Sequence, residues 1–260
     1  MSDLYFIDCI LLTVEYTSGM RISSFKKESI MDLILFSFNI NLFTQGSILT
    51  PESKSIMKLM PFINEDFFPS HGEGINNETG VSSKVLKVEK EMDGCRLSVV
   101  FAPWAISIIV ESRSFVECSQ VISKVEYLIN LLNNCFGDKS IIGSRLATIL
   151  TVCLKNTPEL DEIIYNKYFK GETRPFEWSF RQAHTSKFED EDTFNIVSVN
   201  KGHATIGYGG VVFDGDAIVV NVDNNTLPVN KVKRFSLGEN SFLNNLITKT
   251  IGDFLSVKGE

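Results

Sequence analysis

The chain has 260 residues, 43% of them hydrophobic and 22% charged, which is typical of a globular protein and excludes disordered and fibrous classes. Its 25 basic and 32 acidic residues give a net charge of −7. Proteins that bind nucleic acid usually carry a positive domain or stripe, whereas the densest basic cluster here is only Lys231, Lys233 and Arg234. We therefore do not expect nucleic acid to be the main partner.

The five cysteines are widely spaced, the closest pair being Cys118 and Cys135, which indicates neither a disulfide framework nor a metal site. They are typical of small buried side chains in a reducing compartment. The three histidines do not stand at metal-ligand spacing, so the sequence predicts no metal and no cofactor. The most apolar stretch, Leu33–Phe43, is too short and too polar to cross a bilayer. We expect a cytoplasmic protein with no membrane segment and no signal peptide.

The N-terminal segment, residues 1–60, is predicted to be rich in β-structure. Apolar and polar residues alternate over 10–16 and again over 36–42, the period of a strand with one buried face. A short helix is expected after Ser24. Residues 61–83 mix prolines, glycines and asparagines without either period, which predicts a long loop or linker.

The loop 61–83 leaves two interpretations open. It is either a disordered connector or a binding loop. The second interpretation depends on Phe62, Phe67 and Phe68, three apolar side chains in an otherwise polar segment, which we take as candidate partner-binding residues.

The main part of the chain, residues 84–260, is predicted to consist mostly of hairpin-connected strands, with a few helices between them and one at the end. Further strands are predicted at residues 85–91, 96–100, 105–110, 176–184, 193–199, 203–208 and 217–222. Asp93-Gly94 and Phe213-Asp214-Gly215-Asp216 have the composition of hairpin turns. Apolar residues at intervals of three and four predict helices at 115–136 and 240–255.

Three further signals concern the helix ends and one ambiguous segment. Ser114 and Glu117 resemble a capping box, and Gly137 is placed to end the helix. Thr157-Pro158 predicts the start of a short helix that runs to about residue 169. Residues 141–154 predict a buried strand, with a helix as the alternative.

The order of these elements predicts the α+β class, with one or two curved antiparallel sheets and long helices packed on one face. We expect residues 1–60, the loop 61–83 and residues 84–260 as successive parts, or one continuous domain.

The run Glu189-Asp190-Glu191-Asp192 is the most conspicuous cluster of charge. It is interpreted as a solvated hairpin loop, as an acidic patch for a basic partner, or as a divalent-cation site. We take these four residues as candidate partner-binding residues. An enzymatic alternative places His184 and His203 on neighbouring strands near Asp190 or Asp192, where a histidine beside a carboxylate serves as a general base.

Several elements of the second half resemble a bacterial family that is sporadically distributed, functionally uncharacterised and found in variable genomic islands. The resemblance covers about residues 85–255. It rests on the helix 115–136, Ser144-Arg145-Leu146, the helix near Asp161–Tyr168, the strand-rich Phe176–Asn221 and the closing helix. It implies an accessory gene, in phage defence or as an immunity protein to a toxin, and it implies no catalytic residue.

Two hypotheses for function follow. The first is a non-enzymatic protein-binding module, either an accessory subunit of an anti-phage defence system or an immunity or inhibitor protein. Its partner would be another protein, encoded for example by a neighbouring gene, and self-association is a further option. The second is an enzyme or ligand receptor with a pocket enclosed between an antiparallel sheet and a helix.

Overall fold

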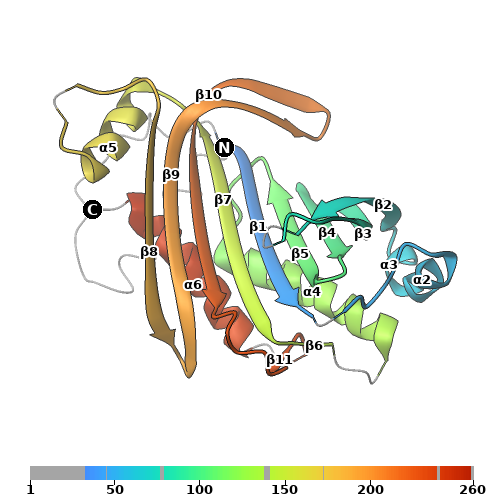
Figure 1. Ribbon diagram of the computed structural model, residues 1–260. Helices are drawn as coiled ribbons and strands as arrows, with labels where there is room; N and C mark the ends of the chain where they lie inside the picture. The colour runs from blue at the N-terminus through green and yellow to red at the C-terminus, as the bar shows by residue number, and fades with distance from the viewer. Residues whose placement is uncertain are drawn as a thin grey trace.

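The computed structural model describes residues 33–44, 46–76, 79–137, 141–171, 173–238 and 241–258. Of these described residues, 49% are in strands and 26% are in helices. Nine strands form one sheet in the order β2-β3-β4-β5-β1-β7-β10-β9-β8, and every neighbouring pair is antiparallel (Figure 1). The predicted strand at 10–16 and the helix after Ser24 lie outside the described residues.

The strands and helices have the following bounds. The strands are β1 (Leu33–Phe43), β2 (Phe68–Ile75), β3 (Ser82–Met92), β4 (Cys95–Phe101), β5 (Ala105–Ser112), β6 (Ile142–Gly143), β7 (Arg145–Lys155), β8 (Trp178–Phe188), β9 (Glu191–Tyr208), β10 (Val211–Thr226) and β11 (Phe235–Ser236). The helices are α2 (Ser53–Lys58), α3 (Met60–Ile63), α4 (Cys118–Phe136), α5 (Pro158–Tyr168) and α6 (Ser241–Lys258). The short strands β6 and β11 pair with each other in a second sheet.

Strand β1 occupies the middle of the large sheet, between β5 and β7. Its alternating sequence explains this position, because Phe36, Phe38, Ile40 and Leu42 all project to one side and are at most 1% exposed. Strands from before and after residues 61–83 therefore belong to the same sheet and share one hydrophobic core.

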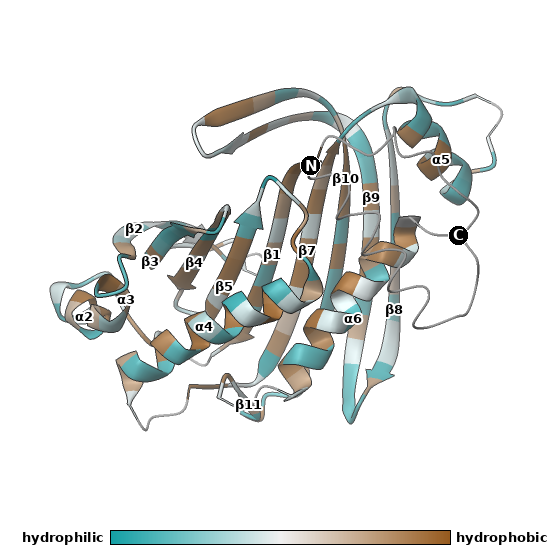
Figure 2. Cartoon of the chain, turned by 180° about the vertical axis from the view of Figure 1, so that it is seen from behind, coloured by the Kyte–Doolittle hydropathy of each residue, from teal (hydrophilic) through white to brown (hydrophobic). Residues whose placement is uncertain are grey.

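The two main helices pack against the middle of the sheet, α4 against β5 and α6 against β7 and β10 (Figure 2). Helix α4 begins after Glu117, whose side chain and that of Gln120 form a reciprocal capping box, in place of the predicted Ser114–Glu117 pair. It ends at Gly137, where φ is +60°. The rings of Phe115 and Phe254 stack at 6.2 Å and connect the start of α4 to α6.

The prediction of one or two curved antiparallel sheets with long helices packed on one face is wrong. The structure is dominated by a single nine-stranded sheet, and its helices are short beside its strands. Strand β9, with 18 residues, spans about 60 Å at 3.3 Å per residue, whereas α4, with 19 residues, spans only about 28 Å at 1.5 Å per residue. The apolar periodicity of the helical segments is the strongest pattern in the sequence, so it leads to a prediction in which helices are too prominent.

The second half also contains longer strands than predicted. The runs 193–199 and 203–208 form one continuous strand, β9, and the predicted turn at Phe213–Asp216 lies inside β10. The chain reverses instead at Gly209 and Gly210, both at positive φ. Residues 61–83 hold the end of α3, strand β2 and the first residues of β3, rather than only loop. Residues 145–155 form strand β7, in agreement with the strand predicted for 141–154.

No helix in the described part of the chain has both the length and the apolar character needed to span a membrane.

Candidate functional site

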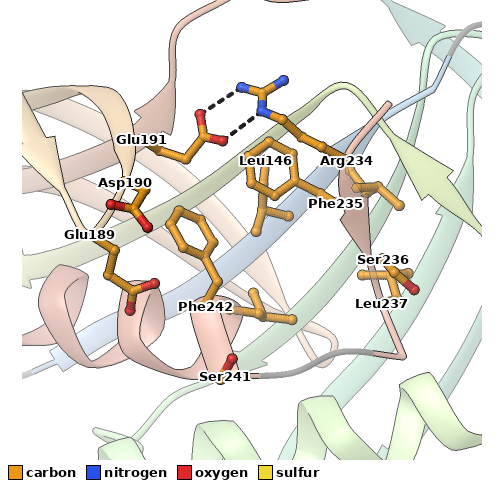
Figure 3. Close-up of a pocket in the computed structure, with 12 residues that line it drawn as sticks. Leu146, Glu189, Asp190, Glu191, Arg234, Phe235, Ser236, Leu237, Ser241 and Phe242 are labelled. Carbon is orange, nitrogen blue, oxygen red and sulfur yellow. Dashed lines mark hydrogen bonds and ion pairs between the residues drawn. The ribbon is translucent and has the colours of Figure 1, made fainter. Parts of the chain in front are cut away.

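A pocket of about 260 Å³ lies between the β8–β9 turn, strand β11 and the first turn of α6 (Figure 3). Acidic side chains lie along one side of it and apolar side chains form its interior. Its lining consists of Leu42, Leu146, Glu189, Asp190, Glu191, Arg234, Phe235, Ser236, Leu237, Ser241, Phe242 and Leu243. The site is therefore assembled from four parts of the chain that are far apart in sequence, around residues 42, 146, 189–191 and 234–243.

The acidic side comes from the tight turn that joins β8 to β9. Phe188 pairs with Glu191, so only Glu189 and Asp190 form the loop, and Glu189 adopts a positive φ of 51°. Both loop side chains are exposed. The Asn245 amide Nδ2 donates to the Glu189 carboxylate Oε1 at 2.6 Å and so fixes its direction from α6. Within the described chain, the Asp190 carboxylate has no hydrogen-bond partner.

The third carboxylate of the turn, Glu191, is already neutralised. Arg234 binds it with two parallel hydrogen bonds, Nε to Oε1 at 2.6 Å and Nη2 to Oε2 at 2.8 Å. The Arg234 guanidinium also lies over the Phe235 ring at 4.5 Å, and its Nη1 donates to the backbone oxygens of Ser144 and Val232. Arg234 thus ties β11 to the acidic turn and leaves Glu189 and Asp190 as the net negative charge of the pocket.

The interior of the pocket is rigid because its side chains belong to the core. Leu42, Leu146 and Leu237 are at most 3% exposed. The Phe242 ring contacts Phe235 at 5.3 Å and Phe188 at 5.7 Å between ring centroids. A cation with an apolar stem would therefore find packed hydrocarbon and aromatic surface inside the pocket and carboxylates along one side.

The structure brings together three of the predicted site residues. Glu189, Asp190 and Glu191 line the pocket, whereas Asp192 is exposed and is not part of the lining. Phe62 and Phe67 are 0% and 2% exposed and belong to the core, so their rings are not available to a partner. Phe68 is 70% exposed, but it begins β2, and β2 and β8 form opposite edges of the nine-stranded sheet.

The structure does not form the predicted pair of histidines. His184 is paired with Asn195, and His203 contacts Asp214 at 2.9 Å in the extended part of the β9–β10 hairpin. Neither histidine lines the pocket. Within the described residues, no group of three histidine, cysteine, aspartate or glutamate side chains is placed to hold a metal ion.

Sequence reasoning did not find Arg234, Phe235 or Phe242. Arg234 was grouped with Lys231 and Lys233 as a basic cluster, although its guanidinium is bound to an acidic residue 43 positions away. Such a pairing depends on the tertiary fold and leaves no local pattern. No protein-family model matches this sequence, and a search of curated proteins finds no match.

Proposed function

We propose that this chain is a non-enzymatic protein-binding module whose acidic pocket accepts a lysine or arginine side chain from a partner protein. The observation that carries this proposal is the pairing of an apolar interior with the carboxylates of Glu189 and Asp190, neither of which contacts a cationic group of the described chain.

The chemistry of the pocket matches a long basic side chain. Lysine and arginine have an apolar stem and a charged head, so the stem would pack on Phe242 and Leu237 while the head contacts the two carboxylates. Arg234 shows the same interaction within the chain, because its guanidinium pairs with a carboxylate and lies on an aromatic ring. A neutral or acidic side chain would displace water from the two carboxylates without supplying an opposite charge in its place.

The size of the pocket favours a single side chain over a larger ligand. Pockets for small molecules and cofactors usually enclose about 300–1,000 Å³. At about 260 Å³ this pocket falls below that range. This comparison favours a protein partner over the alternative of a ligand receptor or an enzyme with an enclosed substrate.

As a biological setting we propose an immunity or inhibitor protein, or an accessory subunit of an anti-phage defence system. Its support is the sequence resemblance over residues 85–255. An acidic pocket would suit an inhibitor of a basic toxin, because opposite charges steer association and set specificity.

The pocket can be tested first with small probes. We would record amide NMR spectra of the labelled protein during titration with N-acetyl-arginine amide, and with N-acetyl-citrulline amide as the neutral control of nearly equal shape. We expect the arginine probe alone to shift the resonances of residues 189–191, 235–237 and 241–243. Equal shifts with both probes, or shifts elsewhere only, would count against a cation site.

The protein partner is tested by co-purification followed by a measured affinity. A double variant, Glu189→Gln with Asp190→Asn, removes both charges while retaining side-chain shape. Glu162→Gln, an exposed acid on α5, is the matched control. We expect the double variant to bind the purified partner at least about tenfold more weakly, since hydrogen bonds to charged groups contribute about 1.5–3 kcal/mol. Unchanged affinity would reject the pocket as the binding site.

A further inference from the structure

Strand β8 forms an outer edge of the nine-stranded sheet (Figure 1). It pairs with β9 in a regular register, and no other strand of the described chain pairs with it. Most of its residues are exposed: Ser179, Arg181, Gln182, Ala183, His184, Thr185 and Lys187. An edge of this length carries a row of backbone N–H and C=O groups that can pair with another strand.

The register identifies which backbone groups are free to pair. The β8–β9 loop has two residues, so Phe188 and Glu191 exchange the first pair of backbone hydrogen bonds. Alternate residues of β8 then bond to β9, and those between them direct their N–H and C=O groups away from the sheet. The outward set is Ser179, Arg181, Ala183, Thr185 and Lys187.

This outward set is complementary to a second copy of itself. In an antiparallel pairing centred on Ala183, each Arg181 lies opposite Thr185 and each Lys187 lies opposite Ser179, so no like charges of the outward set face each other. About ten backbone hydrogen bonds would form across the two strands. A pairing centred on Arg181 is worse, because it places two guanidinium groups directly opposite each other.

The charges at the ends of β8 support the same pairing. Glu177 directly precedes β8 and, by register, projects to the same face as Lys187. In the pairing centred on Ala183, Glu177 of one copy is the diagonal neighbour of Lys187 of the other, within reach of a long side chain. Lys187 forms no ion pair within the described chain. Glu189, which this register places opposite Glu177, directs its carboxylate toward Asn245 instead.

An exposed aromatic residue lies at the same edge. Phe176 is 82% exposed and is two residues before the start of β8. In the pairing centred on Ala183 it would lie beside the β8–β9 turn of the second copy and lose contact with water.

We propose that two copies of this chain associate through their β8 strands, antiparallel and about a two-fold axis at Ala183, so that their sheets become one continuous sheet. Charge complementarity between Lys187 and Glu177 selects a second copy as the occupant of this edge.

The association is tested by analytical ultracentrifugation of the full chain over a wide range of concentration. We expect the wild-type chain to form a dimer reversibly. Ala183→Pro removes an outward N–H, a change that an edge strand tolerates, and should give a folded monomer. Ala183→Val retains the N–H and should remain dimeric. A wild-type chain that is monomeric at every concentration, or a folded Ala183→Pro variant that still forms dimers, would overturn the proposal.

A charge exchange tests the contact between Lys187 of one copy and Glu177 of the other, even if the proline variant does not fold. Lys187→Glu and Glu177→Lys should each weaken dimerisation by about tenfold, because each creates two repulsive pairs in the dimer. The double variant should regain most of the wild-type affinity. If the double variant does not recover, the pairing centred on Ala183 is rejected, because that pairing requires Lys187 of one copy to lie near Glu177 of the other.

Discussion

The indole Nε1–H of Trp178, at the start of β8, donates to the carboxylate Oδ1 of Asp161 on α5 at 2.9 Å. The other oxygen of this carboxylate, Oδ2, accepts a hydrogen bond from the Lys201 ammonium on β9 at 2.8 Å. Asp161 is only 4% exposed, and the Arg174 guanidinium lies 3.5 Å away. One buried carboxylate therefore holds α5 to both strands at the outer side of the sheet.

Asp161→Asn should destabilise the protein by about 3 kcal/mol, because it leaves the Lys201 ammonium buried without its counter-charge. Urea unfolding followed by circular dichroism measures this loss. Adding Lys201→Met, which removes the buried ammonium, should recover part of the stability. A double variant as unstable as the sum of the two single variants would show that the carboxylate and the ammonium do not interact.

Acid should weaken the same contact. Burial raises the pKa of Asp161, but hydrogen bonds from Lys201 and Trp178 and the charge of Arg174 lower it by more, so the net pKa is below the ordinary 3.8. As pH falls, the unfolded chain binds this proton first, so Asp161 stabilises the fold above about pH 4 and loses that contribution as pH falls through the lowered value. We expect the unfolding free energy of the wild type to fall more steeply below pH 4 than that of Asp161→Asn. Parallel pH profiles would contradict this assignment.

Gly143→Ala should destabilise the chain beside the acidic pocket. A Cβ at Gly143 would lie 2.6 Å from both the Leu42 side chain and the backbone oxygen of Phe43, and the backbone oxygen cannot move aside. Crowding of this kind costs about 1–3 kcal/mol. Thermal unfolding measures the loss. The control is Gly207→Ala, where no atom lies within 4 Å of the new Cβ, and it should leave the melting temperature nearly unchanged.

Tyr208→Phe should release the end of the β9–β10 hairpin. The Tyr208 hydroxyl donates to the Glu111 backbone oxygen at 3.2 Å and accepts from the Arg96 N–H at 3.1 Å, which holds the hairpin end on β4 and β5. Hydrogen exchange of residues 202–216 should become faster while exchange in α4 stays unchanged. The loss of global stability should be small, about 1 kcal/mol. Unchanged exchange in the hairpin would contradict this role of the hydroxyl. It would mean that the Arg96 guanidinium, 4.8 Å from the centre of the Tyr208 ring, holds the hairpin end without it.

Elements whose signals are local were predicted well from the sequence. The stripe of apolar residues and Gly137 placed α4 to within a few residues. Thr157 accepts a hydrogen bond from the Leu160 N–H at 3.2 Å, as its predicted role at the helix start requires. Asp93 and Gly94 both take the positive φ of the predicted hairpin turn.

Elements decided by distant partners were predicted less well. The Asp214-Gly215 pair has turn composition, but Asp214 instead accepts hydrogen bonds across the hairpin from Thr205 and contacts His203. Phe62 and Phe67 lie among polar residues in the sequence, yet their rings pack together at 5.2 Å, and Phe67 contacts Tyr127 of α4. In each case the deciding contact comes from another element, which no local window contains.

The acidic turn of the candidate site was found because four consecutive carboxylates form a local signal. The remaining half of the pocket was not, because Arg234 and Phe242 reach it only when β11 and α6 are in place. The sequence therefore predicts the acidic residues of the site, but not the residues that enclose the pocket beside them.

The central place of β1 has a consequence for synthesis on the ribosome. This strand precedes all the others of the described sheet, yet it needs β5 on one side and β7, which begins a hundred residues after β1 ends, on the other. A growing chain that has reached only the end of β5 would carry a sheet of five strands with the second edge of β1 open to solvent. That edge is the point where a nascent chain of this protein is most exposed to incorrect pairing, until β7 leaves the ribosome and closes it.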